Sequence, residues 1–550
     1  MTNNNPDPAK LRRIVFATSM GTVFEAYDFI LFGSLAPVIS VQFFAGVNET
    51  AAFIFALLTF AAGYVIRPLG ALFFGSLGDR TGRKRAFLIT ITLMGAATFA
   101  IGLLPTYAMV GILAPVLLIA MRLIQGLAFG GEYGGAVVYT AEHAPQRRRG
   151  FYVSWIQAAA GFALFMSFFV IWITRSLLGE EAFNNWGWRI PFLLSIVLLA
   201  ISLWMRLRLE ESPLFQQMLA EGKAAKQPLR ETFAQWQHLK LVLLVLFGLL
   251  MGQGVIYYTA HFYSQFFLMQ LLDFPAATMT LIMMIVTFIS VPLYLAFGWL
   301  SDQIGRKPII LTGTILMAIT AFPIFYTFTA VVNPALAEAQ QNAPVTVHAN
   351  PAQCSLQFDP VGQTSFTTSC DIAKSTLAAL GISYTNTQAT PGTVAYITIG
   401  TDTTLTWRVT SIEGATLDEP SLLTAREDFR ARLLEALTEA GYPSSVNLEA
   451  INLPLLTGLM LALIVFAAMV YAPAPTMALE IFPTRIRYTG LSLPYHIGAG
   501  WFGGFLPAIA FSMVAANGSI YFGLWYPVVM ITITILVLAF FLPETRGQKL

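Results

Sequence analysis

The stretch GSLGDRTGRK, residues 75–84, occurs a second time as GWLSDQIGRK, residues 298–307. Five pairs of identical residues are all separated by the same number of residues along the chain. The pairs are Gly75 and Gly298, Asp79 and Asp302, Gly82 and Gly305, Arg83 and Arg306, and Lys84 and Lys307. A further pair, AEHAPQRRRG at 141–150 and ALEIFPTRIRYTG at 478–490, follows the two copies at a larger offset. Repeats of this kind in an apolar chain are typical of secondary transporters built from two related halves. The sequence therefore predicts a duplicated membrane protein with extra residues inserted in its second half.

The composition favours the same architecture. Hydrophobic residues make up 56% of the 550 residues and charged residues 11%, which excludes a water-soluble protein for most of the chain. Because a membrane-crossing helix needs roughly 20 apolar residues, we expect an all-α membrane protein with twelve transmembrane helices in two six-helix halves. The predicted spans are 14–40, 52–77, 86–105, 109–139, 152–174, 190–207, 240–268, 277–299, 309–332, 453–478, 489–514 and 520–542. We interpret the first as an uncut helix, because the head before it has no signal-peptide architecture.

Lysine and arginine predict the orientation of this bundle. With the N-terminus inside, basic residues gather in short loops on the cytoplasmic side, where the positive-inside bias is most diagnostic. These residues include Arg83, Lys84, Arg85, Arg147, Arg148, Arg149, Arg306, Lys307, Arg485 and Arg487. Both termini are therefore expected in the cytoplasm. The net charge of +2 gives no indication of nucleic-acid binding.

The inserted residues divide the second half. We expect an N-terminal six-helix half at 1–210, a cytoplasmic connector at 211–239, helices seven to nine at 240–333, an outward-facing insert at 334–451, and helices ten to twelve at 452–550. The insert is predicted to be a small α/β domain. Residues 392–400 alternate like a strand, 421–441 have helical periodicity followed by a glycine stop, and 371–380 favour a shorter helix.

Both cysteines of the chain, Cys354 and Cys370, lie in this insert. In an oxidising compartment the two thiols could pair, and closing a loop of that size would contribute about 3 kcal/mol in the entropy model. The alternative is two unpaired thiols, and the residues alone leave both open.

The repeated loops have a mechanical interpretation. Glycines at tight positions and an aspartate beside arginine and lysine can join two helix ends by charge-assisted hydrogen bonds. Bonds that exist in only one conformation would bias the balance between inward-open and outward-open forms. The alternative is that the loops only anchor the topology. Neither interpretation makes these residues substrate ligands.

Taken together, these motifs resemble the major facilitator superfamily. Four stretches are similar to its metabolite:proton symporter family, which includes carriers of α-ketoglutarate, citrate, shikimate and proline/betaine. They are FEAYDFILFG at 24–33, RPLGALFFGSLGDRTGRK at 67–84, RLIQGLAFGGEYGGA at 122–136 and RGFYVSWIQ at 149–157. The resemblance covers nearly the whole chain apart from 334–451. The insert is one departure, and Ala26, where the family usually has an aromatic residue, is another.

Ionisable residues inside predicted spans are costly and point to function. Glu25 and Asp28 are three apart on one helix face, and Asp28 and Arg122 are expected at a similar depth, where they could pair. Glu132 and Glu25 are expected nearer the cytoplasm. The functional hypothesis is a carboxylate that binds and releases a proton beside an arginine that holds either that carboxylate or an anionic substrate. The alternative is a static ion-pair network, and Arg67 is expected to be structural.

Helix seven supplies the polar candidates from the second half. Gln253 and Tyr257 are four residues apart and share a face, with Gln253 near mid-depth. His261 is expected further out, as a gate or merely an interfacial residue. These three residues complete the predicted substrate-site set.

Enzymatic and metal-dependent functions are not indicated. The sequence has no Walker motif, no metal-spaced histidine or cysteine cluster and no recognisable nucleophile elbow. We expect a proton-coupled importer of a small polar metabolite in the bacterial inner membrane, acting as a monomer without a cofactor other than the proton. Arg122 favours an organic acid, and a proline- or betaine-type zwitterion is the alternative. A nutrient sensor using the insert and a proton-antiport exporter are two further hypotheses.

Overall fold

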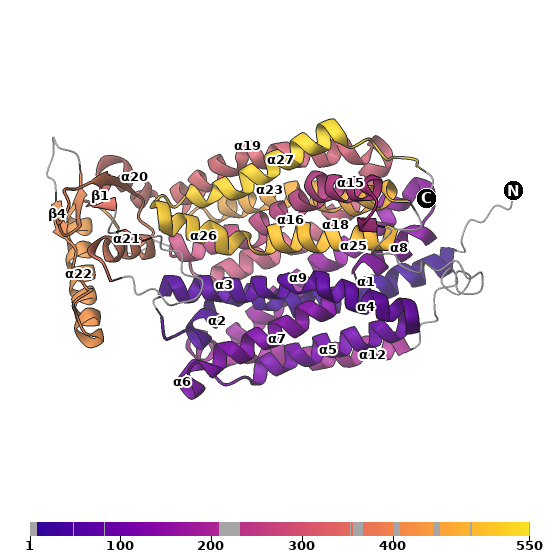
Figure 1. The fold of residues 1–550 in the computed structure, drawn as a ribbon, viewed down its shortest axis with the longest axis horizontal. Helices are drawn as coiled ribbons and strands as arrows, with labels where there is room; N and C mark the ends of the chain where they lie inside the picture. Colours follow the sequence, from indigo (N-terminus) through magenta and orange to yellow (C-terminus); the bar gives the residue numbers. More distant parts are fainter. Residues whose placement is uncertain are drawn as a thin grey trace.

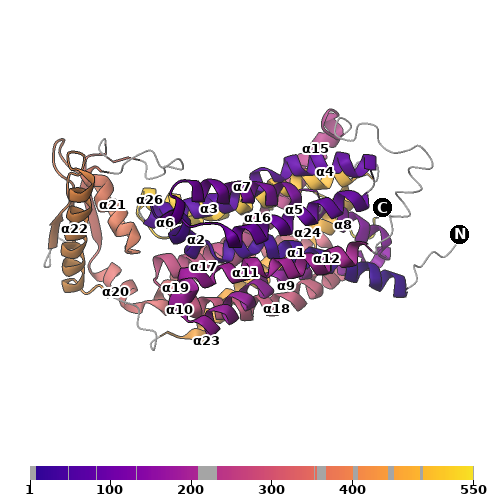
Figure 2. The same ribbon diagram turned by 90° about the horizontal axis from the view of Figure 1, so that it is seen from below.

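The computed structural model describes residues 8–47, 49–81, 83–131, 133–207, 232–351, 354–355, 367–400, 407–443, 451–483 and 487–548. Its long helices run side by side in one bundle, with a small separate domain beyond one end (Figures 1 and 2). The first helix begins and the last helix ends at the opposite end of the bundle (Figure 1). We call these the insert end and the terminal end.

Each predicted span corresponds to a helix of the described chain. Among the described residues, nine helices are long and apolar enough to cross a membrane, and a bent pair makes a tenth candidate. The two remaining predicted spans match the shorter apolar helices Leu88–Leu103 and Arg189–Ile201. The predicted all-α membrane architecture is therefore confirmed.

The first half is built from helices joined by short turns. Its elements are α1 (Pro8–Ser34), α2 (Ala36–Phe43), α3 (Glu49–Val65), α4 (Arg67–Thr81), α5 (Arg83–Leu103), α6 (Tyr107–Val110), α7 (Leu113–Phe129), α8 (Tyr133–His143), η1 (Gln146–Arg148), α9 (Arg149–Leu178), α10 (Glu180–Ala182), η2 (Phe183–Gly187), α11 (Arg189–Leu193) and α12 (Ser195–Leu207). The predicted first span is broken rather than straight, because α1 and α2 meet at 61°. Pro37, in the first turn of α2, lacks the N–H that would continue the helical bonding across the break.

The second half contains the counterpart helices and the insert. Its bundle elements are α15 (Trp236–Val245), η3 (Leu246–Leu250), α16 (Met251–Tyr258), η4 (Thr259–Tyr263), α17 (Ser264–Phe266), η5 (Phe267–Leu271), α18 (Ala276–Ile304), α19 (Arg306–Val332), α23 (Leu453–Tyr471), α24 (Ala474–Ile481), α25 (Arg487–Tyr495), η8 (His496–Gly503), α26 (Leu506–Asn517), η9 (Phe522–Leu524) and α27 (Trp525–Phe541). Segments η3, η4, η5 and η8 are π-helical. Such wide turns are rare and concentrate at functional sites.

The insert forms a small α/β domain beyond the bundle (Figure 1). Its elements are α20 (Pro334–Asn342), β1 (Val345–Ala349), α21 (Ser369–Ala379), β2 (Tyr384–Gln388), β3 (Tyr396–Ile399), β4 (Trp407–Thr410) and α22 (Glu419–Glu439). The sheet order is β2-β1-β3-β4, with β1 and β2 parallel and the other pairs antiparallel. The predicted strand at 392–400 and the helices at 371–380 and 421–441 match β3, α21 and α22.

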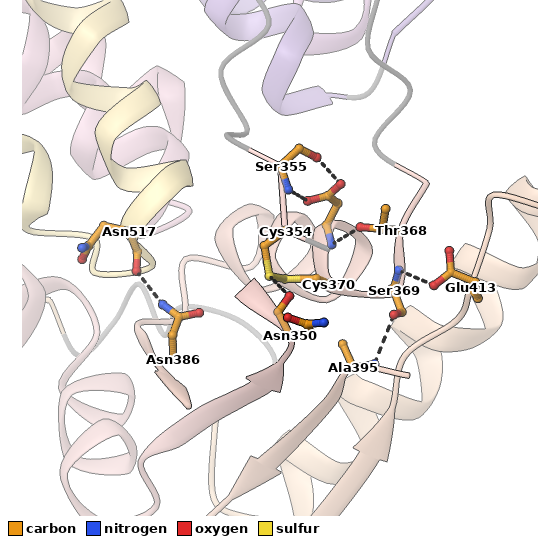
Figure 3. Close-up of a disulfide and its surroundings, with 11 residues drawn as sticks. Asn350, Cys354, Ser355, Thr368, Ser369, Cys370, Asn386, Ala395, Glu413 and Asn517 are labelled. Carbon is orange, nitrogen blue, oxygen red and sulfur yellow. Dashed lines mark hydrogen bonds between the residues drawn. A yellow bond between two sulfur atoms is a disulfide. The ribbon is translucent and has the colours of Figure 1, made fainter. Parts of the chain in front are cut away.

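A disulfide joins Cys354 to Cys370 beside α21 (Figure 3). Asp371, the next residue, is buried, and its carboxylate accepts bonds from the backbone N–H and the hydroxyl of Ser355. Thr368 caps the helix by accepting from the N–H of Asp371. The bonded pair therefore fixes the start of α21 against the chain that leads out of β1.

Among the described residues, three hydrogen bonds attach the insert to the second half. The N–H of Tyr384 donates to Gly518 O at 3.0 Å, and the Asn386 amide donates to Asn517 O at 3.2 Å (Figure 3). The N–H of Ile520 donates to the hydroxyl of Ser383 at 3.3 Å. Because all three bonds reach the turn between α26 and η9, the sheet is held to the outer loops of helices eleven and twelve.

Candidate functional site

Polar side chains lie between the two candidate residues of helices one and four. Arg122 Nη1 donates to Oε1 of Gln125 at 2.8 Å, and Gln125 Nε2 donates to the Thr98 hydroxyl at 2.7 Å. The Thr98 hydroxyl donates to Met94 O at 2.9 Å and lies beside the Asp28 carboxyl. Within the described chain Asp28 has no ion pair, and its Oδ1 has no hydrogen-bond partner. The predicted direct pairing of Asp28 with Arg122 is thus replaced by a relay through Gln125 and Thr98.

Arg122 is placed as a buried cation among aromatic rings. It is fully buried, its Nη2 donates to Phe60 O at 3.1 Å, and its guanidinium lies 4.4 Å from the Phe32 ring centroid. The neighbouring Arg67 lies 4.0 Å from the ring of Tyr64 and 3.9 Å from that of Phe129. Arginine stacked on aromatic faces keeps its charge in a low-dielectric region. The site therefore combines two buried guanidinium groups with a carboxyl at Asp28.

Helix seven presents four polar residues at intervals of four. Gln253, Tyr257, His261 and Gln265 are each at most 5% exposed. An α-helix advances about 100° per residue, so positions four apart drift by roughly 40°. The π turn η4 lies between Tyr257 and Gln265, and its wider turn counteracts that drift. The stacking of Tyr257 on His261, with ring centroids 4.1 Å apart, confirms a common face for these two.

Three of these four residues offer atoms that bind nothing in the described chain. Gln253 lies beside Tyr133, but within the described chain neither of its amide atoms has a hydrogen-bond partner, and Gln265 Nε2 has none either. His261 Nδ1 lies 2.9 Å from Tyr257 O, and since a carbonyl only accepts, Nδ1 carries the proton and donates. Its Nε2 is then an acceptor, buried and without a partner among described residues. Buried polar atoms left unbonded cost free energy, so their presence here indicates a ligand or water site.

Tyrosines from both halves meet at the same level. Tyr257 stacks on Tyr471 with centroids 4.7 Å apart, and Tyr133 stacks on Tyr495 at 3.7 Å. The hydroxyls of Tyr471 and Tyr495 lie 3.5 Å apart, which links the two stacks. Gln157 Nε2 donates to the Tyr133 hydroxyl at 2.8 Å. The site is thus lined by aromatic faces and phenol groups contributed by both repeats.

The second copy of the repeated loop closes the terminal end. Asp302 accepts from the N–H of Gly150 at 2.9 Å and from that of Phe151 at 2.8 Å. Both donors belong to the first turn of α9, where the helix dipole favours a carboxylate. Arg306 Nη1 holds the same aspartate at 2.8 Å. A carboxylate of the second half therefore binds a helix N-terminus of the first half.

The structure explains why two positions in this copy of the motif are glycine. Gly305 has φ of 113° between α18 and α19, a conformation that side chains disfavour. Gly298 lies against Ser154 and Gly150, and a Cβ there would collide with the Ser154 side chain. Lys307 Nζ donates to Leu542 O at 2.8 Å. Close approach of α18 to α9 thus depends on the motif itself.

Several predicted residues fall beyond what the structure describes. The side chains of Glu25, Asp79, Arg83 and Lys84 lie outside the described part, as do Gly82 and Glu132 altogether. Gly75 belongs to α4. Sequence reasoning did not select Gln125, Thr98, Gln265, Tyr133 or Tyr471. Gln125 had a signal, because it lies one helical turn after Arg122 in an apolar stretch.

A cavity of about 400 Å³ opens at the insert end between the halves. Its lining residues come from α1, α2, α9, α10 and η2 on one side and from helices seven and eight on the other. They include Gln42, Arg175, Glu180, Gln265, Asp273 and Thr280. The bend between α1 and α2 forms part of its wall. We call this cavity the vestibule.

Comparison with known proteins agrees with the architecture. The model of the "Sugar (and other) transporter" family matches residues 14–239, 216–347 and 440–550. The crystal structure of a D-xylose-proton symporter aligns with 98% of this chain and 99% of its own, with a TM-score of 0.59 and 16% identity. A proton:xylose symporter bound to 6-bromo-6-deoxy-D-glucose gives a TM-score of 0.61 at 17% identity, over 99% and 98%. These likenesses establish the fold.

Curated relatives are closer in sequence. The proline/betaine transporter of Salmonella typhimurium is 38% identical over 331 residues, which are 58% of this chain and 65% of the relative. The match thus spans less than two thirds of that protein's length. The shikimate transporter of Escherichia coli is 37% identical over 322 residues, which are 58% of this chain and 72% of the relative. These relatives are membrane transporters rather than enzymes. The chain belongs to the sugar (and other) transporter family.

Proposed function

We propose that this chain imports a small carboxylate-bearing metabolite together with protons by alternating access. The relay from Asp28 through Thr98 and Gln125 to Arg122 carries the proposal. It places a carboxyl that can bind a proton near a buried cation that can bind an anion, with Thr98 and Gln125 between them. Asp28 and Arg122 are also residues that the sequence singles out as ionisable groups inside predicted spans.

Coupling follows from competition for Arg122. In this scheme the substrate carboxylate takes the Arg122 guanidinium, which now donates to Gln125 and to Phe60 O. Gln125 is then released, and its altered bonding to Thr98 changes how well the ionised form of Asp28 is stabilised. A proton and a substrate would therefore be bound together rather than independently.

The closed terminal end supports an alternating mechanism. Contacts between the halves there involve Asp302 with the start of α9, while the vestibule lies at the insert end. If the basic loops mark the cytoplasmic side, this arrangement is the form that receives substrate from outside. Substrate binding at the tyrosine stacks would precede opening at the terminal end.

A zwitterionic substrate is the second candidate. Faces of Tyr257 and Tyr471 offer cation–π sites, which recognise ammonium groups. The proline/betaine transporter of Salmonella typhimurium is among the relatives, as is a shikimate transporter. A ligand with a carboxylate and an ammonium would use both Arg122 and the aromatic faces.

Proton flux in proteoliposomes tests the proposal. Purified protein is challenged with dicarboxylates, shikimate-like acids, proline and betaines, alongside Asp28→Asn and the control Glu435→Gln, which removes an exposed acid of the insert. We expect one solute class to drive proton influx in the wild type and in Glu435→Gln, but not in Asp28→Asn. Solute-driven flux of opposite sign would indicate antiport. Concentrative uptake that survives in Asp28→Asn would contradict the coupling role of this residue.

A further inference from the structure

The vestibule contains unbonded hydrogen-bond donors from both halves. Arg175, at the end of α9, is 8% exposed, and Gln265, on helix seven, is 3% exposed. Within the described chain, Arg175 Nη1 and Gln265 Nε2 have no hydrogen-bond partner. Both residues line the same cavity of about 400 Å³, which lies within the usual range for small-molecule sites. Buried donors of this kind call for an acceptor.

The orientation of Arg175 is fixed without using this donor. Its Nε lies 3.3 Å from Oε2 of Glu180, and its guanidinium lies 4.5 Å from the Phe183 ring centroid. Asn184 holds the other oxygen of Glu180 at 3.5 Å. The ion pair thus occupies one edge of the Arg175 guanidinium and leaves Nη1 to bind a second carboxylate.

The charges of the vestibule select for a particular ligand. Among the described residues, its lining has one cation, Arg175, and two acids, Glu180 and Asp273. Glu180 is half-exposed and Asp273 is exposed. A simple dianion would meet these acids as well as the donors. A solute that has a positive group beside its carboxylate would satisfy both kinds of partner.

We propose that the vestibule is an outer binding site for small zwitterions, distinct from the Asp28 and Arg122 relay. The carboxylate bridges Arg175 Nη1 of the first half and Gln265 Nε2 of the second, and the cationic group faces Glu180 and Asp273. Gln265 is also the outer member of the polar series Gln253, Tyr257, His261 and Gln265. Solute held in the vestibule would therefore lie at the start of a polar face that leads to the tyrosine stacks. This inference rests on the proposed transport function, because it names the class of solute that enters.

A single introduced thiol can report occupancy. Val38 is half-buried and lines the vestibule, and the chain's two cysteines are bonded to each other. Val38→Cys would therefore be the only free thiol. Its rate of reaction with N-ethylmaleimide is measured in proteoliposomes with L-proline, L-prolinamide or tetrahydrofuran-2-carboxylate. These probes share one ring and differ in having both charges, only the positive charge, or only the negative charge.

We expect L-proline to protect the thiol and the two singly charged probes to protect it at least about tenfold more weakly. Arg175→Gln and Gln265→Leu should each raise the half-protecting proline concentration by about tenfold or more, which is the usual loss for a bond to a charged group. Arg175→Lys keeps the positive charge but lacks the planar guanidinium group, so its half-protecting proline concentration should be intermediate. Equal protection by all three probes, no protection by proline, or values unchanged in both Arg175→Gln and Gln265→Leu would overturn the proposal.

A further comparison separates the vestibule from the centre. Gln253→Leu alters the inner end of the polar series and should leave protection of Val38→Cys by proline intact. Protection that is lost in Gln253→Leu but kept in Arg175→Gln would place the ligand at the centre and overturn the vestibule site. Proline-driven proton flux without thiol protection would contradict only this inference. Protection with no solute-driven proton flux across the panel would contradict the proposed symport instead.

Discussion

Arg149 Nη1 lies 2.8 Å from Oε1 of Glu480, and this buried ion pair joins the first half to the second. Its counterpart in the repeat joins Arg487 to Glu142 at 3.9 Å. In the duplicated sequence Arg149 corresponds to Arg487, and Glu142 to Glu480. Each half thus supplies one arginine and one glutamate, and the pairs cross between the halves.

Removing Glu480 should weaken closure of the terminal end. Glu480 also accepts from the Thr545 hydroxyl at 2.7 Å and lies 3.5 Å from Arg306 Nη2. Breaking a buried pair leaves a charge uncompensated, at a cost of about 3–5 kcal/mol. Glu480→Gln should therefore increase maleimide labelling of Ser492→Cys, a buried position that faces Gly134 across the halves. Arg546→Gln, at an exposed residue nearby, serves as the control. Labelling that stays at the control rate would show that the pair does not hold this end closed.

Gln125 should be required for coupling although it carries no charge. Gln125→Leu removes the bonds to Arg122 and Thr98, and a bond to a charged group is worth about 1.5–3 kcal/mol. We expect kcat/KM for proton-driven uptake to fall by roughly tenfold to a hundredfold. Thr534→Val, which alters a fully buried hydroxyl in the second half, is the matched control. Normal uptake by Gln125→Leu would remove the relay from the mechanism.

Gln253 should contribute to affinity and not to folding. Its amide is buried and unbonded in the described chain, so an apolar residue of similar size should leave the thermal unfolding temperature unchanged or higher. Gln253→Leu should nevertheless raise KM for uptake by about tenfold. Parallel measurements of Tm and uptake check this. A lower Tm with normal KM would identify Gln253 as a structural residue.

The disulfide should stabilise the insert alone. Cys354 and Cys370 are 16 residues apart, so the entropy model gives about 3 kcal/mol for their bond. Replacing both by serine should make the insert more susceptible to limited proteolysis in membranes, while proton-driven uptake stays near the wild-type rate. A reductant should reproduce this effect in the wild type. Loss of uptake in the folded double variant would tie the insert to the transport cycle.

Much of the architecture could be predicted because bilayer thickness imposes a minimum length on each apolar helix. The Asp302 and Arg306 motif was visible because it repeats along the sequence, and the buried Asp28 and Arg122 were visible because charges are rare inside spans. The break at Pro37 and the π turns of helix seven were not predicted. Pro37 offered a visible signal, because proline interrupts helical hydrogen bonding. The π turns had none, because their sequences remain apolar and helix-compatible.

The partners within the site were harder to predict than its charges. Thr98 comes close to Asp28 through tertiary packing, which no local pattern encodes. Tyr133 and Tyr495 are far apart in sequence and stack only because the two halves meet. Tyrosines are also ordinary residues of membrane helices, so their role depended on the contact between repeats.

The insert should move together with the second half, because its hydrogen bonds to the bundle reach that half. Its sheet is bonded to Asn517, Gly518 and Ile520, all of them in the second half. A rigid body fixed at one edge follows every rotation of its support, and displacement grows with distance from the pivot. The tip of α22 lies far from the bundle in Figure 1. It would therefore be displaced further than the end of any helix in the bundle. The distance between a fluorophore at this tip and a second fluorophore on the first half would therefore change strongly each time the transporter alternates between its two open forms.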